Sequence, residues 1–180
     1  SLVLLEDDFA AIVSAVRLGR RIFANLRQAL IYTLAIHVPI VCLSILPVVF
    51  GMPLVLAPIH IAFLELVIDP ACSVVFEAEP WDEKLMLRPP RSASEPLLNN
   101  RHLVLSLILG GLGTLVVFGL YAGLLHTDTR AEEARALAFI ALMAANIALI
   151  LSCRTTRPGW RSLIVGVPMV GRWVMAATLL

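Results

Sequence analysis

Charged side chains are scarce in this chain of 180 residues: Asp, Glu, Lys and Arg make up 15%, whereas hydrophobic residues make up 59%. A soluble domain could not bury so large an apolar share, so the composition predicts a membrane protein with several spanning segments. The formal net charge is only +1, and the sequence has no basic patch interleaved with aromatic residues. Nucleic-acid binding is therefore excluded.

Cysteine is also rare. Cys42, Cys72 and Cys153 lie in or at the ends of apolar segments, and none belongs to a Cys-x-x-Cys pair. This pattern provides neither a disulfide framework nor a soft-metal site, and it predicts cysteines that pack as small apolar side chains. The chain begins at Ser1 rather than methionine and ends inside an apolar run, which predicts a piece of a longer protein.

Long apolar runs separated by polar ones predict an all-α, polytopic transmembrane helix bundle with a cytoplasmic stalk helix. About 20 apolar residues suffice to cross the hydrocarbon core, and the amphipathic spacing at the start predicts the stalk. The predicted order is the end of a preceding domain and the stalk over 1–28, spanning helices over 29–50, 53–76, 102–125 and 134–152, connections over 77–101, 126–133 and 153–166, and the start of a truncated spanning helix over 167–180.

Basic residues are distributed unequally between the two sides of this arrangement. Eleven Lys and Arg residues lie in the stalk and in the two connections on its side, whereas Arg130 and Arg135 lie on the other side. Cytoplasmic segments carry the excess of Lys and Arg in membrane proteins. The amino terminus is therefore predicted to be cytoplasmic.

Proline and glycine positions predict how the helices run and pack. No proline or glycine pair interrupts the stretch from Ile22 to His37, so the stalk is predicted to continue into the first span as one helix. Gly119 and Gly123 form a Gly-x-x-x-Gly pair in the third span. This pair predicts close approach of a neighbouring helix.

Two carboxylates stand inside the second apolar run. Glu65 and Asp69 are four residues apart, so a helix places both on one face. An ionised carboxylate is costly inside a bilayer, and hard cations prefer oxygen ligands, so the pair predicts an ion site. The alternative is a structural role, in which both groups are neutral or hydrogen-bonded to His37 or His60.

Two prolines predict carbonyl groups that are free to bind a cation. Pro70 follows Asp69 and leaves the carbonyl of Leu66 without its helical hydrogen bond, and Pro39 does the same for the carbonyl of Ala35. Broken helices at membrane depth usually line a site. A break at Pro39 is therefore predicted to face the break at Pro70.

His37 in the first span and Asn146 in the fourth complete the candidate metal site with Glu65 and Asp69. We expect the two carboxylates to face the bundle interior, toward His37 and Asn146. The alternative for each is a hydrogen-bonded structural residue, because a lone histidine in a helix is more often structural than a ligand.

Several motifs resemble those of P-type cation-transporting ATPases and follow one another in the same order. The resemblance is closest to the calcium-pump-like class, especially its bacterial members. Residues 6–9 and 19–26 resemble the end of the phosphorylation domain and the stalk that leads into the fifth membrane helix. Residues 66–70 are similar to the ion-binding sixth helix, and residues 88–91 to the cytoplasmic loop that follows it. The resemblance implies the carboxy-terminal transport portion of such a pump, from the fifth helix into a truncated ninth.

The resemblance implies that Glu65 and Asp69 bind the transported cation and that the stalk transmits movement to them. ATP and Mg²⁺ are expected for the full-length parent, whereas this span lacks the Asp-Lys-Thr-Gly phosphorylation motif and is predicted not to hydrolyse ATP alone. Ile40 and Met143 stand where calcium pumps carry glutamates, which argues against a two-calcium site. Asp69-Pro70 replaces the Cys-Pro pair of heavy-metal pumps, which argues against soft ions such as copper.

The same resemblance implies an integral protein of the bacterial plasma membrane. Its expected partners are the lipid bilayer, the transported cation and the cytoplasmic domains of the same parent chain. Two other functions fit the carboxylate and proline pattern, namely a secondary cation transporter or channel without ATP coupling and a structural membrane subunit. An Asp-Lys-Thr-Gly motif upstream in the full-length gene would favour the pump.

Overall fold

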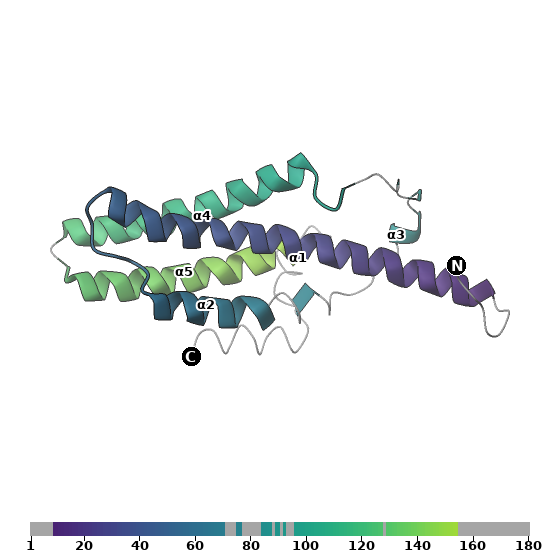
Figure 1. Cartoon of the computed structure of the whole chain (residues 1–180), viewed down its shortest axis with the longest axis horizontal. Helices are drawn as coiled ribbons and strands as arrows, with labels where there is room; N and C mark the ends of the chain where they lie inside the picture. Colours follow the sequence, from purple (N-terminus) through teal and green to yellow (C-terminus); the bar gives the residue numbers. More distant parts are fainter. Residues whose placement is uncertain are drawn as a thin grey trace.

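Long helices form the part of the chain that the computed structural model describes, which consists of residues 9–70, 75–76, 84–87, 89–90, 92, 96–127 and 129–154. No strand occurs in these residues, and the all-α bundle is therefore confirmed. Within the same residues, α1 (Phe9–Val49), α4 (Asn100–His126) and α5 (Ala131–Arg154) are long and apolar enough to cross a membrane. Figure 1 shows α4 and α5 beside one half of α1 and α2 next to α5, while the amino-terminal half of α1 extends away from them.

Helix α1 is continuous over 41 residues, which confirms that the stalk and the first span form one helix. At 1.5 Å per residue it is about 60 Å long, roughly twice the thickness of the hydrocarbon core. The residues of α1 that are buried all lie between Ile31 and Pro47. The helix also continues through Pro39, so the predicted break there is wrong. One proline removes one backbone hydrogen bond, and packing of neighbouring helices on both sides keeps the rest.

The end of α1 is capped by a glycine. Gly51 has a φ of 65°, a conformation that glycine adopts without strain. The Gly51 N–H donates to the carbonyl of Val48 at 3.2 Å, and the Met52 N–H donates to the carbonyl of Pro47 at 2.8 Å. These two bonds constitute a Schellman motif, which ends the helix and reverses the chain.

Helix α2 (Pro58–Pro70) is shorter than the span predicted over 53–76. Residues 53–57 are not helical, and the helix begins at Pro58, because proline is favoured at the first helical position. The predicted start of this helix is therefore corrected by five residues. Phe76, further along the same apolar run, packs against α1, with its ring centroid 5.4 Å from that of Tyr32.

Other predicted segments lie partly or wholly outside the described residues. The connection predicted over 77–101 contains α3 (Lys84–Leu87), a single turn that contacts α1. Helix α5 includes residues 153 and 154, which the sequence assigns to the next connection. The rest of 153–166, all of 167–180, and residues 1–8 lie outside the described residues.

Helix α4 packs on α1 through a stripe of residues spaced three or four apart, and its small members allow the two backbones to meet. A Cβ atom built on Gly110 would collide with the carbonyl oxygen of Ala35 and would stand 2.6 Å from Cβ of Val38. One turn earlier, Ser106 Oγ donates to the carbonyl of Ile31 at 3.1 Å. The buried residues of this stripe are Ser106, Gly110, Thr114, Val117 and Tyr121.

Among the described residues, the close approach occurs at Gly110 and not at the Gly-x-x-x-Gly pair. A Cβ atom on Gly119 or Gly123 would meet no other side chain or neighbouring backbone within 4 Å in the described part of the chain. Both glycines lie outside the stripe that faces α1. The spacing of small residues identifies a motif, but only the orientation of the helix selects the face that packs.

Candidate functional site

The side chains of Glu65 on α2 and His37 on α1 approach each other. Glu65 Oε1 is 3.7 Å from His37 Nε2, and His37 Nδ1 is 2.7 Å from the carbonyl oxygen of Thr33 one turn earlier on α1. A carbonyl oxygen can only accept a hydrogen bond, so Nδ1 carries a hydrogen. When the imidazole is neutral, Nε2 therefore carries a free lone pair and can only accept a hydrogen bond or bind a cation. When the imidazole is charged, Nε2 carries a second hydrogen.

The Glu65–His37 pair lies at the edge of the bundle rather than in its interior. The side chains of Glu65 and His37 are 44% and 45% exposed. On the same helix as Glu65, Phe63 and Leu66 are exposed as well. The predicted contact with α1 is therefore present, but this face of the described helices is open. Ionisable groups are costly in contact with lipid tails, so the pair requires further polar partners when the protein is in a bilayer.

Asp69 follows Glu65 by one turn, and its backbone belongs to α2. Its side chain lies outside what the structure describes, so the expected pairing of the two carboxylates is not tested. Among the described residues, no three His, Cys, Asp or Glu side chains gather in a way that could hold a metal ion. Glu65 and His37 are the two predicted ligands whose side chains the structure brings together.

Asn146 belongs to a different polar pair, with Tyr32. The Tyr32 hydroxyl donates to Asn146 Oδ1 at 2.5 Å, and the two residues are 0% and 1% exposed. Asn146 Nδ2 has no hydrogen-bond partner among the described residues, and no hydrogen bond joins Asn146 to Glu65 there. Tyr32 precedes His37 by five residues, about 7.5 Å along α1. Within the described residues, the hydrogen-bond partner of Asn146 is thus Tyr32.

Sequence reasoning missed Tyr32, although a signal was present. A buried tyrosine hydroxyl usually has a hydrogen-bond partner, and Tyr32 stands in a mostly apolar run. Searching the other spans for a polar residue would have pointed to Asn146.

The carbonyl that Pro39 releases does not contribute to this site. The Ala35 carbonyl oxygen faces α4 at Gly110. The packing of α4 on α1 therefore covers this oxygen, and the prediction that it is available as a ligand is wrong.

Removal of the Tyr32 hydroxyl is expected to destabilise the bundle. Tyr32→Phe leaves Asn146 Oδ1 buried without its donor, which costs about 1–3 kcal/mol and should lower the thermal unfolding temperature of the detergent-solubilised protein. Tyr32→Phe combined with Asn146→Leu should recover part of the loss, because neither polar atom is then left unpaired. Equal unfolding temperatures for wild type and Tyr32→Phe would show that the hydrogen bond contributes nothing.

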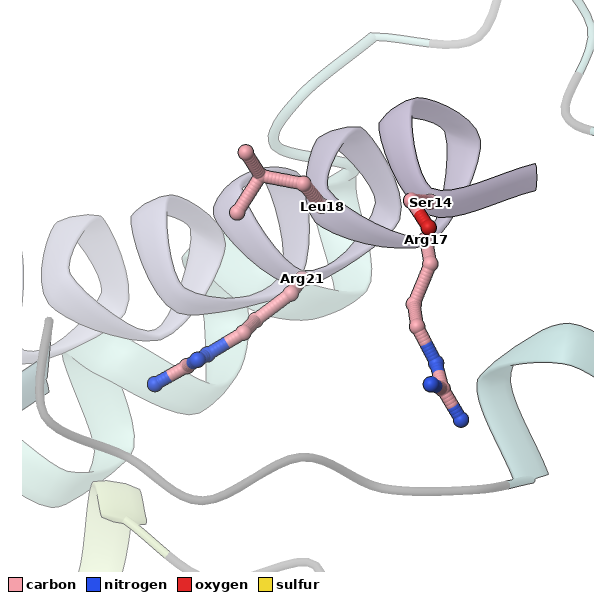
Figure 2. Close-up of a pocket in the computed structure, with 4 residues that line it drawn as sticks. All are labelled: Ser14, Arg17, Leu18 and Arg21. Carbon is pink, nitrogen blue, oxygen red and sulfur yellow. The ribbon is translucent and has the colours of Figure 1, made fainter. Parts of the chain in front are cut away.

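A pocket of about 290 Å³ lies on the stalk, far from the Glu65–His37 pair. Ser14, Arg17, Leu18 and Arg21 line it, and Figure 2 shows Arg17 and Arg21 extending to the same side of α1. Arg21 precedes His37 by sixteen residues, about 24 Å along the helix. The pocket therefore belongs to the stalk and cannot share a ligand with the pair in the membrane.

Comparison with known families identifies the chain. A family model described as "Cation transporting ATPase, C-terminus" matches residues 53–180. The chain belongs to this family. It is the C-terminal transmembrane portion of a P-type cation ATPase, and hence part of an integral membrane protein. This membership confirms the resemblance read from the motifs of the stalk and the second span.

Relatives of this P-type ATPase portion include bacterial and animal proteins. The "Probable cation-transporting ATPase F" of Mycobacterium tuberculosis is 29% identical over 175 residues, which cover 97% of this chain and 19% of that protein. A "Sodium/potassium-transporting ATPase subunit alpha" of Hydra vulgaris is 38% identical over 114 residues, which cover 62% of this chain and 11% of that protein. A "Potassium-transporting ATPase alpha chain 2" of Rattus norvegicus is 36% identical over 129 residues, which cover 67% of this chain and 12% of that protein. The chain thus spans about a fifth or less of these relatives.

Proposed function

We propose that this chain is the ion-translocating portion of an ATP-driven pump, and that Glu65 and Asp69 bind the transported hard cation. The observation that carries the proposal is the contact between Glu65 and His37 within two apolar helices. A carboxylate oxygen is a preferred ligand for a hard cation. Asp69 lies one turn further along α2, on the face that a helical repeat shares with Glu65.

His37 contributes to this site in two ways. Its Nδ1–H bonds to the Thr33 carbonyl, and such a bond from the second ring nitrogen fixes the tautomer and orientation of a histidine ligand. With a cation bound, the neutral ring offers the Nε2 lone pair beside the Glu65 carboxylate. The 3.7 Å separation of Nε2 from Glu65 Oε1 allows both atoms to bind one cation. Asn146, through the buried amide that contacts Tyr32, is proposed as an outer polar group of the same pathway.

The rest of the parent protein supplies the energy in this proposal. ATP and Mg²⁺ bind to parts of the parent outside this chain, in keeping with the names of the ATPase relatives. Exposed apolar side chains along the stalk support a contact with a cytoplasmic domain of the same parent. These are Phe9, Val13, Val16, Leu18 and Ile22.

The proposed orientation and location have separate support. Arginines on the stalk, together with the basic residues of the 77–101 connection, favour a cytoplasmic amino terminus. The mycobacterial relatives favour a bacterial plasma membrane.

Equilibrium cation binding to the full-length parent protein tests the site. His37→Gln is expected to weaken binding about tenfold, because one cation ligand worth about 1.4 kcal/mol is lost. His126→Gln is the matched control, since His126 is exposed at the far end of α4. Binding of a radioactive cation is measured for both variants and for wild type. If His37→Gln bound the cation as tightly as wild type, His37 would not belong to the site, and the observation that carries the proposal would be lost.

A further inference from the structure

Residues 53–57, which join α1 to α2, form a connection without helical structure. Val55 and Leu56 are nevertheless buried in the core of the bundle. The carbonyls of Pro53 and Leu54, the two exposed residues of this α1–α2 connection, find their hydrogen-bond donors on neighbouring helices.

Two side chains from α4 and α5 supply these donors. The Tyr121 hydroxyl donates to the carbonyl of Pro53 at 2.7 Å, and Arg135 Nε donates to the carbonyl of Leu54 at 2.9 Å. The two acceptors are consecutive in the chain, whereas one donor comes from α4 and the other from α5. Figure 1 shows the α1–α2 connection at the same end of the bundle as the end of α4 and the start of α5.

The connection is also fixed where α2 begins. The Ala57 N–H donates to Nδ1 of His60 at 3.1 Å, and the His60 ring packs against Phe139 of α5 with a centroid distance of 4.8 Å. The start of α2 is therefore tied to α5 through both backbone and side chain. Glu65 follows Pro58 by seven residues, about 10 Å along the helix, so its position depends on where α2 begins.

We propose that Tyr121 and Arg135 are positioning residues for the cation site. They anchor the α1–α2 connection to α4 and α5, and the anchored connection holds Glu65 opposite His37. The proposal rests on the function proposed above for Glu65. Without the anchor, α2 begins in more than one place, and only a fraction of the molecules present Glu65 in the binding position. The apparent cation affinity falls in proportion to that fraction, while turnover at saturating cation is unchanged.

Cation-stimulated ATP hydrolysis by the full-length parent protein in lipid vesicles tests whether the apparent affinity falls while the maximal rate is unchanged. Tyr121→Phe and Arg135→Met each remove one donor and keep the size of the side chain. Each is expected to raise the half-saturating cation concentration about 2- to 10-fold, the range expected for one hydrogen bond, with an unchanged maximal rate. Arg135→Lys is expected to recover part of the affinity, because its ammonium group can still donate to the Leu54 carbonyl.

Two variants at the same end of the bundle serve as controls. Thr127 Oγ1 donates to the carbonyl of Leu124, and Arg130 pairs with Glu132 and Glu133 at 3.7 Å. Thr127→Val and Arg130→Met should therefore keep the wild-type half-saturating concentration. A lower maximal rate with unchanged half-saturation in Tyr121→Phe and Arg135→Met would indicate a merely structural role and overturn the proposal. Wild-type half-saturation and maximal rate in both Tyr121→Phe and Arg135→Met would overturn the proposal too.

Amide hydrogen exchange of residues 54–57 measures the anchor without relying on the cation site. Faster exchange in Tyr121→Phe and Arg135→Met than in the two controls is expected, and equal exchange would overturn the anchor. Glu65→Gln, measured alongside, separates the two ideas. If the anchor variants exchange faster but Glu65→Gln binds the cation like wild type, the proposed function is overturned. The positioning role is overturned with it, and the anchor remains as a structural contact.

Discussion

Glu65→Gln in the full-length parent protein is expected to abolish cation-stimulated ATP hydrolysis. Glutamine has nearly the same shape as glutamate, so α2 and the contact with α1 should persist. The charge is lost, however, and with it the attraction between cation and carboxylate, which is strong where water is scarce. Removing one charged partner costs about 1.5–3 kcal/mol, which corresponds to a loss of cation affinity of roughly 10- to 100-fold.

The measurement is the rate of ATP hydrolysis as a function of cation concentration in reconstituted vesicles. Asp69→Asn is expected to behave like Glu65→Gln, because its backbone lies one turn away on the same helix. Glu132→Gln is the matched control, since Glu132 is an exposed residue in the first turn of α5 and pairs with Arg130. Stimulation of Glu65→Gln at wild-type cation concentrations would show that the carboxylate does not bind the transported ion.

A side chain at Gly110 is expected to prevent correct assembly of the bundle. Gly110→Val would bring its Cβ into collision with the carbonyl oxygen of Ala35 and to 2.6 Å from Cβ of Val38. Backbone atoms cannot move aside as a flexible side chain can, so α4 must shift away from α1. The shift would also break the bond from Ser106 to Ile31. Overpacking alone costs about 1–3 kcal/mol, and the lost hydrogen bond adds about 1 kcal/mol.

The yield of monodisperse protein after detergent extraction and its thermal unfolding temperature measure this effect. Gly111→Val and Gly119→Val are matched controls on the same helix, because a Cβ at either position would meet no such neighbour within 4 Å in the described part of the chain. Both should assemble like wild type. If Gly110→Val were as stable as these controls, the backbone contact between α1 and α4 would have to be absent in the bilayer.

The all-α bundle and the position of Glu65 beside α1 could be predicted from the sequence because they depend on local properties. The length of an apolar run determines whether a helix can span, and the absence of proline between Ile22 and His37 determines that the stalk and the span are continuous. The depth of a polar residue in its run then indicates which residues lie at the same level. His37 and Glu65 are brought together by this rule.

Contacts that depend on how a helix is rotated could not be predicted in this way. Five glycines occur in α4 between Gly110 and Gly123, and their spacing does not show which one faces α1. Gly110 does, because it shares a face with Ser106 and Thr114. Asn146 meets Tyr32 instead of Glu65 for the same reason. Hydropathy alone places the start of α2 too early, because residues 53–57 are apolar but not helical and hydropathy does not distinguish a buried connection from a span.

The hydrogen bond between Tyr32 and Asn146 has a consequence for the biogenesis of the protein. The two residues are 114 positions apart, and a ribosome adds about 5–20 residues per second. Tyr32 is therefore synthesised roughly 6–23 seconds before its partner. During that interval the hydroxyl must be satisfied by backbone, water or the insertion machinery. Membrane insertion of α1 thus precedes its final packing, and release of a stable product awaits the arrival of α5.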